Sequence, residues 1–87
     1  MKHAGVQTLR QLSDLLEQIR QRPLLKEKKL GIFYCRSRSF LHFHEDPAGL
    51  FADVGFGDDF ERLPVNTKKE WKHLLSAIDK ALASSMR

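Results

Sequence analysis

The sequence predicts an α+β fold, a two-layer sandwich in which an antiparallel meander of three to four strands carries an N-terminal and a C-terminal helix on one face. Apolar residues recur at helical spacing near both ends of the chain, and short runs rich in aromatic and β-branched residues lie between them. The chain has 87 residues, which suffice for one hydrophobic core. We therefore expect a single domain over residues 1–87.

The first predicted element is a helix over residues 7–21. Apolar side chains recur in steps of three and four around it and form one stripe, namely Val6, Leu9, Leu12, Leu15, Leu16 and Ile19. Pro23 ends this helix, because the residue before a proline avoids helical backbone angles. Residues 22–29 are rich in charge and are expected to be a basic connector.

Three strands are predicted next, over residues 30–35, 40–44 and 50–54. The polar residues 36–39 separate the first two strands as a turn. The tetrapeptide Asp46-Pro47-Ala48-Gly49 has the residues that a type I turn prefers at its first, second and fourth positions. Residues 55–64 contain two glycines and a proline and are expected to be irregular, with a short edge strand at 60–64 left open.

The last predicted element is a helix that begins after Thr67. The sequence Thr67-Lys68-Lys69-Glu70 fits a capping box, in which the threonine oxygen and the glutamate carboxylate bind early amides of the helix. The apolar stripe of this helix consists of Trp71, Leu74, Leu75, Ile78 and Leu82.

Turn positions set the strand register, and register decides which side chains share a face. A turn closed at Pro47-Ala48 places His42 opposite Asp53, and a turn closed at Ser37-Arg38 places Tyr34 opposite Leu41. One face, expected to lie under the helices, collects Leu30, Ile32, Tyr34, Leu41, Phe43, Leu50, Ala52 and Val54. The other face collects Phe33, Cys35, Phe40, His42, His44, Phe51 and Asp53.

The second face has too many rings for a surface left in water. Exposed apolar patches mark partner or ligand sites, and the residues concerned are Phe33, Cys35, Phe40 and Phe51. We expect a non-enzymatic binding or self-association module that uses this face, with a homodimer as one form. The loop over 55–64 is the other candidate to cover it.

A metal- or small-molecule-binding enzyme built on His42, His44 and Asp53 is the alternative. A His-x-His pair on a strand points both imidazoles the same way, and a carboxylate opposite gives three ligands of the kind that Zn²⁺ takes. The same carboxylate could instead orient His42 for acid–base chemistry. In the plainest alternative the histidines fill space and Asp53 hydrogen-bonds to one of them. No cofactor follows from a sequence motif, and zinc is the divalent metal that this set fits.

The charge is uneven along the chain. Residues 1–44 contain nine Lys and Arg against three Asp and Glu (9 − 3 = +6), whereas residues 45–87 contain six against eight (6 − 8 = −2). A nucleic-acid surface is the second alternative, and its candidates are Lys26, Lys28, Lys29, Arg36 and Arg38. We expect a solvated connector and turn in preference, since the ring-and-glycine signature of common RNA-binding sheets is missing.

The expected compartment is the cytoplasm. The single cysteine, Cys35, cannot form an internal disulfide, which agrees with a reducing environment. No window approaches the roughly 18 consecutive apolar residues of a membrane-spanning helix, and no apolar signal region follows the first residues. No contact with a membrane is expected.

The segment Phe40-Leu41-His42-Phe43-His44-Glu45-Asp46-Pro47-Ala48-Gly49-Leu50-Phe51-Ala52-Asp53-Val54 resembles the small bacterial "luciferase-domain" family, in which a strand ending in His-x-His is followed by a short glycine turn and another strand. The resemblance covers the middle third of the chain and departs from the family at the C-terminal helix. It implies no light emission and no assigned activity, and it singles out His42 and His44.

Overall fold

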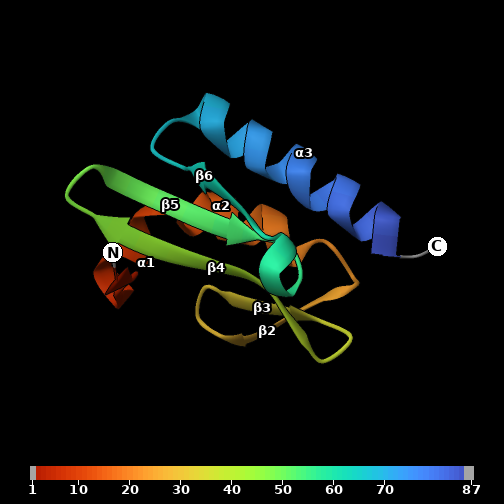
Figure 1. The fold of residues 1–87 in the computed structure, drawn as a ribbon. Coiled ribbons are helices and arrows are strands. Elements are labelled where there is room, and N and C mark those ends of the chain that lie inside the picture. The colour runs from red at the N-terminus through yellow and green to blue at the C-terminus, as the bar shows by residue number, and fades with distance from the viewer. Residues whose placement is uncertain (1, 86–87) are drawn as a thin grey trace.

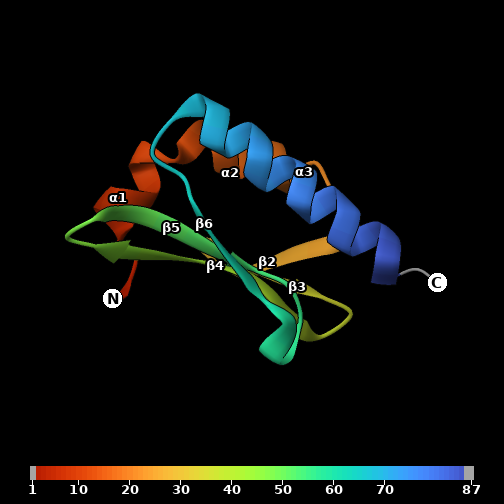
Figure 2. The ribbon, with the colours of Figure 1, turned by 45° about the horizontal axis from the view of Figure 1, so that its top comes forward.

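A computed structural model describes residues 2–85 and has an α+β fold, with helices on one face of an antiparallel sheet (Figure 1). The elements follow in the order β1 (Lys2–His3), α1 (Val6–Gln11), α2 (Ser13–Arg20), β2 (Leu25–Lys29), β3 (Ile32–Cys35), β4 (Arg38–Asp46), β5 (Gly49–Val54), a 3₁₀ turn η1 (Gly57–Asp59), β6 (Glu61–Pro64) and α3 (Lys68–Ser85). Turned by 45°, the molecule shows all three helices above the sheet (Figure 2).

The sheet has more strands than the three to four expected. Its order is β2-β3-β4-β5-β6, and β1 pairs with the far end of β4 beyond β3. β6 fills the edge position that the sequence left open near residues 60–64. The expected basic connector over 22–29 is wrong, because Leu25–Lys29 forms edge strand β2. Edge strands often carry lysines, which discourage pairing with another chain. Such a strand is as polar as a loop, so its sequence does not reveal it.

The N-terminal helix is present but divided. Its backbone turns away from helical angles at Leu12 (φ −98°, ψ 15°), which separates α1 from α2 while the Leu12 side chain remains buried in the core. The capping box of α3 is confirmed, since the Glu70 amide donates to Oγ1 of Thr67 and the Glu70 carboxylate accepts from the amides of Asn66 and Thr67.

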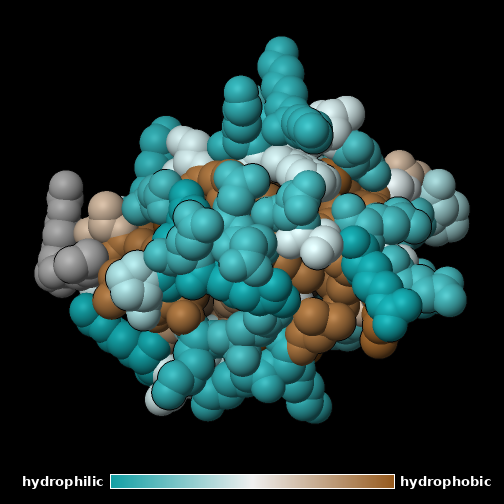
Figure 3. All heavy atoms as spheres, turned by 180° about the vertical axis from the view of Figure 1, so that it is seen from behind, coloured by the Kyte–Doolittle hydropathy of each residue, from teal (hydrophilic) through white to brown (hydrophobic). Residues whose placement is uncertain are grey.

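The hydrophobic core lies between the sheet and the helices. Its buried side chains come from both helical stripes and from alternate strand positions, and include Leu15, Leu16, Ile19, Leu41, Phe43, Ala52, Val54, Leu74 and Ile78. Seen from behind, the molecule shows mainly hydrophilic side chains, with smaller hydrophobic areas between them (Figure 3). None of the described helices combines the length and the hydropathy needed to cross a membrane.

The register of the central hairpin agrees with the sequence, whereas that of the preceding hairpin does not. β4 and β5 pair as expected, with His42 opposite Asp53. The turn from β3 to β4 closes at Arg36-Ser37, where both residues have positive φ (52° and 69°), as a type I′ turn requires. A bulge between the pairs Tyr34–Ser39 and Phe33–Leu41 then shifts the register, so that Phe33 lies opposite Leu41. One extra residue reverses which side chains of β3 face the core.

Three of the residues expected on the open face are therefore in the core instead. Phe33, Cys35 and Phe40 are each 1% exposed and belong to the buried cluster. The Phe40 ring packs on Phe56, which follows β5, at a centroid separation of 5.0 Å. Of the expected interface set, Phe51 alone is only half-buried. These four side chains therefore do not form the exposed apolar face from which self-association was predicted.

Candidate metal site on the open face of the sheet

Histidine and aspartate side chains meet on the sheet face that the helices leave open. Leu41, Phe43, Ala52 and Val54 turn into the core, so the alternate positions on β4 and β5 turn away from it. The hairpin that sets this register is short, and the Asp46 carboxylate accepts from the Ala48 amide within its turn. The sequence therefore predicts correctly that His42, His44 and Asp53 come together.

Three atoms of this group form a small triangle. Nδ1 of His42 lies 2.9 Å from Nε2 of His44, and Nε2 of His44 lies 2.9 Å from Oδ2 of Asp53. The third side, from Nδ1 of His42 to Oδ2 of Asp53, is 3.9 Å. Nε2 of His44 holds either one proton or one lone pair, so in its neutral form it either donates to Asp53 or accepts from Nδ1 of His42. A neutral His44 therefore forms an ordinary hydrogen bond along only one of its two short contacts.

A third histidine reaches the same place from the start of the chain. His3 in β1 pairs with His44 across the sheet, and its ring centroid lies 4.8 Å from that of His44 and 5.6 Å from that of His42. The ligand nitrogens of the three histidines lie within 4.8 Å of one another. Sequence reasoning missed His3 because a two-residue strand has no periodicity to detect.

Arg62 is the second residue that the sequence did not predict. It stands opposite Asp53 on β6, and its Nε and Nη2 donate to the two carboxylate oxygens at 2.7 and 2.9 Å. Burial of Asp53 by itself raises the pKa of the carboxyl, but the hydrogen bonds from Arg62 and the charge of His44 outweigh it and hold that pKa below its ordinary value. Asp53 is therefore an anion at neutral pH.

His42 favours its neutral form. Its burial, first, and the neighbouring charge of His44, second, lower the pKa of His42, although Asp53 opposes them. A neutral imidazole beside a carboxylate is the protonation state that a metal ligand needs. Imidazole nitrogens, such as the three gathered here, and carboxylate oxygens are also ligands that Zn²⁺ takes.

The cationic candidates lie elsewhere. Lys26, Lys28 and Lys29 are on edge strand β2, Arg36 lies in the turn between β3 and β4, and Arg38 is the first residue of β4. Arg36 donates to the last described carbonyl of α3, that of Ser85, at 3.4 Å. The structure thus does not bring these side chains into the histidine cluster.

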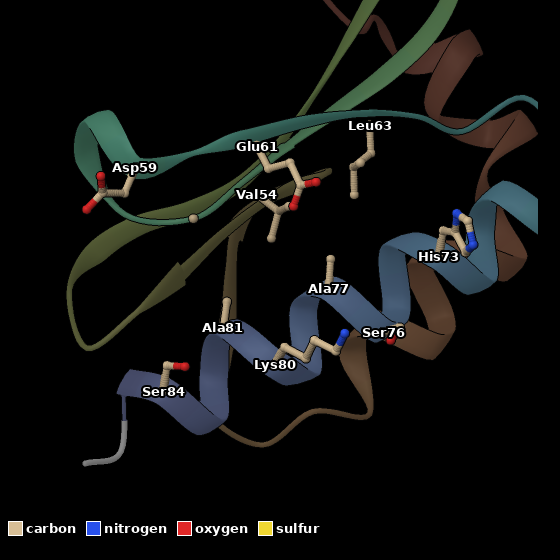
Figure 4. A pocket seen from close by; sticks show the side chains of 11 residues that line it. Val54, Asp59, Glu61, Leu63, His73, Ser76, Ala77, Lys80, Ala81 and Ser84 are labelled. Atoms are coloured by element: carbon tan, nitrogen blue, oxygen red, sulfur yellow. The ribbon is translucent and has the colours of Figure 1, made fainter.

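A groove of about 560 Å³ lies on the other side of the sheet, between β6 and α3. Val54 and Glu61 point from the strands toward the helix, and Ala77 and Ala81 point back toward them (Figure 4). The groove opens on the helix side, so it cannot contribute to the site of His42, His44 and Asp53.

Comparisons of the chain with protein-family models, curated proteins and solved structures give no match. The resemblance to the luciferase-domain family thus remains a prediction. The candidate site is supported by its own geometry.

Proposed function

We propose that this chain is a small metal-binding module that holds one Zn²⁺ ion with His3, His42, His44 and Asp53. The triangle of ligand atoms is the observation that carries the proposal. Zinc lies about 2.0–2.1 Å from imidazole nitrogen, so neighbouring ligand atoms of a tetrahedral ion are about 3.3 Å apart. The observed separations of 2.9, 2.9 and 3.9 Å bracket that value.

The charges of the group also support a cation. Asp53 supplies one negative charge, and Arg62 occupies both of its oxygens from the outer side. A carboxylate oxygen has lone pairs for both a metal and an arginine. Ligating carboxylates are commonly hydrogen-bonded in this way, which fixes their orientation.

Four protein ligands favour a binding role over a catalytic one. Catalytic zinc sites keep one position open for water, whereas closed sites with four protein ligands are structural. Zinc in this position would join β1, which pairs with β4 through two residues only, to the centre of the sheet. We therefore expect metal binding to protect the amides around His3 from hydrogen exchange.

Isothermal titration of metal-free protein with Zn²⁺ tests the proposal. We expect one equivalent to bind. His3→Ala, His42→Ala and His44→Ala should each weaken binding by more than about tenfold, since even an outer partner of a metal ligand contributes about 10- to 100-fold.

His73→Ala is the matched control, because His73 is an exposed histidine on α3 outside the cluster. Its affinity should equal that of the unmodified chain. The absence of zinc binding, or an equal loss in His73→Ala, would contradict the proposed site.

A further inference from the structure

Five cationic side chains gather at one corner of the sheet, formed by β2, β3 and the turn into β4. They are Lys26, Lys28, Lys29, Arg36 and Arg38, and all five are exposed. Among the described side chains of residues 2–57 and 59–85, no ion pair with an acidic side chain neutralises any of them. The acidic residue among them, Glu27, instead accepts hydrogen bonds from Nε and Nη2 of Arg20. This basic corner thus carries five positive charges in a chain whose net charge is +4.

Strand pairing places these charges around one edge of the sheet, with the β2 lysines and the two arginines on opposite faces. Leu25, Cys35 and Arg38 lie in one row across three neighbouring strands. Lys26 lies in the next row, opposite Tyr34. Strands are about 4.8 Å apart, so two strand spacings separate Lys26 from Arg38 by about 10 Å. A flexible polyanion that passes around the edge of the sheet would reach both groups.

Aromatic rings lie directly beneath two of the cations. Nζ of Lys28 lies 5.0 Å from the ring centre of Tyr34, and the guanidinium carbon of Arg38 lies 4.6 Å from that of Phe56. Both rings are half-buried, so they are held in place while part of each stays open. Nucleic-acid bases stack on such rings and on arginine planes, while phosphates pair with the lysines.

We propose that the basic corner binds single-stranded nucleic acid. The unpaired charge would supply the affinity for the backbone, and Tyr34 and the Arg38–Phe56 pair would hold the bases. A duplex hides its base faces and offers only phosphates to these rings. This proposal is independent of the zinc site.

Fluorescence anisotropy with a labelled twelve-nucleotide oligo-dT, in EDTA to keep metal out, tests the proposal. Contacts to about four phosphates give a salt slope of about −2.8, so affinity should fall about 50-fold between 50 and 200 mM KCl. The matching duplex should bind more weakly at both salt concentrations.

Two variants separate the charges from the rings. Lys26→Gln with Lys29→Gln should reduce the salt slope by about 1.4. Tyr34→Leu should leave the slope unchanged and weaken binding about fivefold or more at each salt concentration. The matched control is Lys69→Gln with Lys72→Gln on α3, two exposed lysines outside the corner, and it should bind as the unmodified chain does.

Four results would overturn the proposal. They are the absence of binding at 50 mM KCl, an equal loss in the Lys69 and Lys72 control, tighter binding to duplex with no effect of Tyr34→Leu, and sedimentation with phosphatidylserine vesicles without any oligonucleotide binding. The last result would identify the corner as a membrane-facing surface.

Discussion

Asp53→Asn in metal-free protein should cost about 2–3 kcal/mol of unfolding free energy. The Asp53 side chain is 4% exposed and accepts two hydrogen bonds from Arg62 at 2.7 and 2.9 Å. Hydrogen bonds to a charged group contribute about 1.5–3 kcal/mol each. The asparagine oxygen keeps one of the two, and the partly exposed Arg62 regains water, so the loss stays below the sum.

The chain contains a matched control for this change. Asp79 is held by Arg22 in the same two-bond geometry, at 3.0 and 3.1 Å, but its side chain is 57% exposed. Surface pairs of this kind contribute about 0–1 kcal/mol. Asp79→Asn should therefore change the unfolding free energy by less than about 1 kcal/mol.

Urea unfolding followed by the fluorescence of Trp71, in EDTA, measures both variants. The Trp71 indole donates to the carbonyl of Val65 in the folded chain, so its environment changes on unfolding. Equal and small losses for Asp53→Asn and Asp79→Asn would refute the idea that burial makes the pair of Asp53 and Arg62 important.

Further predictions concern pH, the turn between β3 and β4, and the bulge. The folded-state pKa of His42 lies below its ordinary value of 6.5. On acidification the unfolded chain therefore takes up the proton first, and the unfolding free energy of metal-free protein should fall as pH drops below about 6.5. His42→Gln should flatten this pH dependence in urea unfolding, and an unfolding free energy that rises on acidification would contradict the lowered pKa. Ser37→Gly should raise the unfolding free energy by about 1 kcal/mol, because φ is 69° at Ser37 and glycine relieves that strain. A lower melting temperature in this variant would count against the type I′ turn. Phe33→Ala should cost about 3–5 kcal/mol because the ring is 1% exposed, and Tyr34→Ala clearly less; the reverse order in urea unfolding would place the bulge elsewhere.

The central hairpin was predictable because its signals are local. Asp46, Pro47 and Gly49 fix the turn, and the turn fixes the register that brings His42 and His44 to Asp53. The same reasoning correctly places the capping box at Thr67. Each of these features depends on residues within a few positions of one another.

The preceding hairpin was not predictable for the opposite reason. Arg36-Ser37 lacks the asparagine and glycine that announce a type I′ turn, and the bulge beside Phe33 has no signature of its own. Burial of Phe33 and Cys35 in the core accounts for the turn position and the bulge. This burial outweighs the poor fit of Arg36-Ser37 to a type I′ turn. Side chains at a bulge follow the tertiary packing rather than the local pattern.

His3 and Arg62 join the site through pairings that sequence patterns do not specify. His3 meets His44 across 41 positions of the chain, and Arg62 meets Asp53 only after the irregular segment that follows β5. The lysines of β2 similarly concealed a strand, because an edge strand needs only one buried residue, Leu25, in five. Long-range pairing thus adds two residues to the three that the sequence predicts.

Zinc K-edge X-ray absorption on protein loaded with one equivalent of Zn²⁺ would identify the ligands of the bound ion. We expect a four-coordinate ion with nitrogen and oxygen neighbours at about 2.0–2.1 Å and the multiple scattering of three imidazoles. A sulfur neighbour at about 2.3 Å, or a shell of water oxygens without imidazole scattering, would contradict the site at His3, His42, His44 and Asp53.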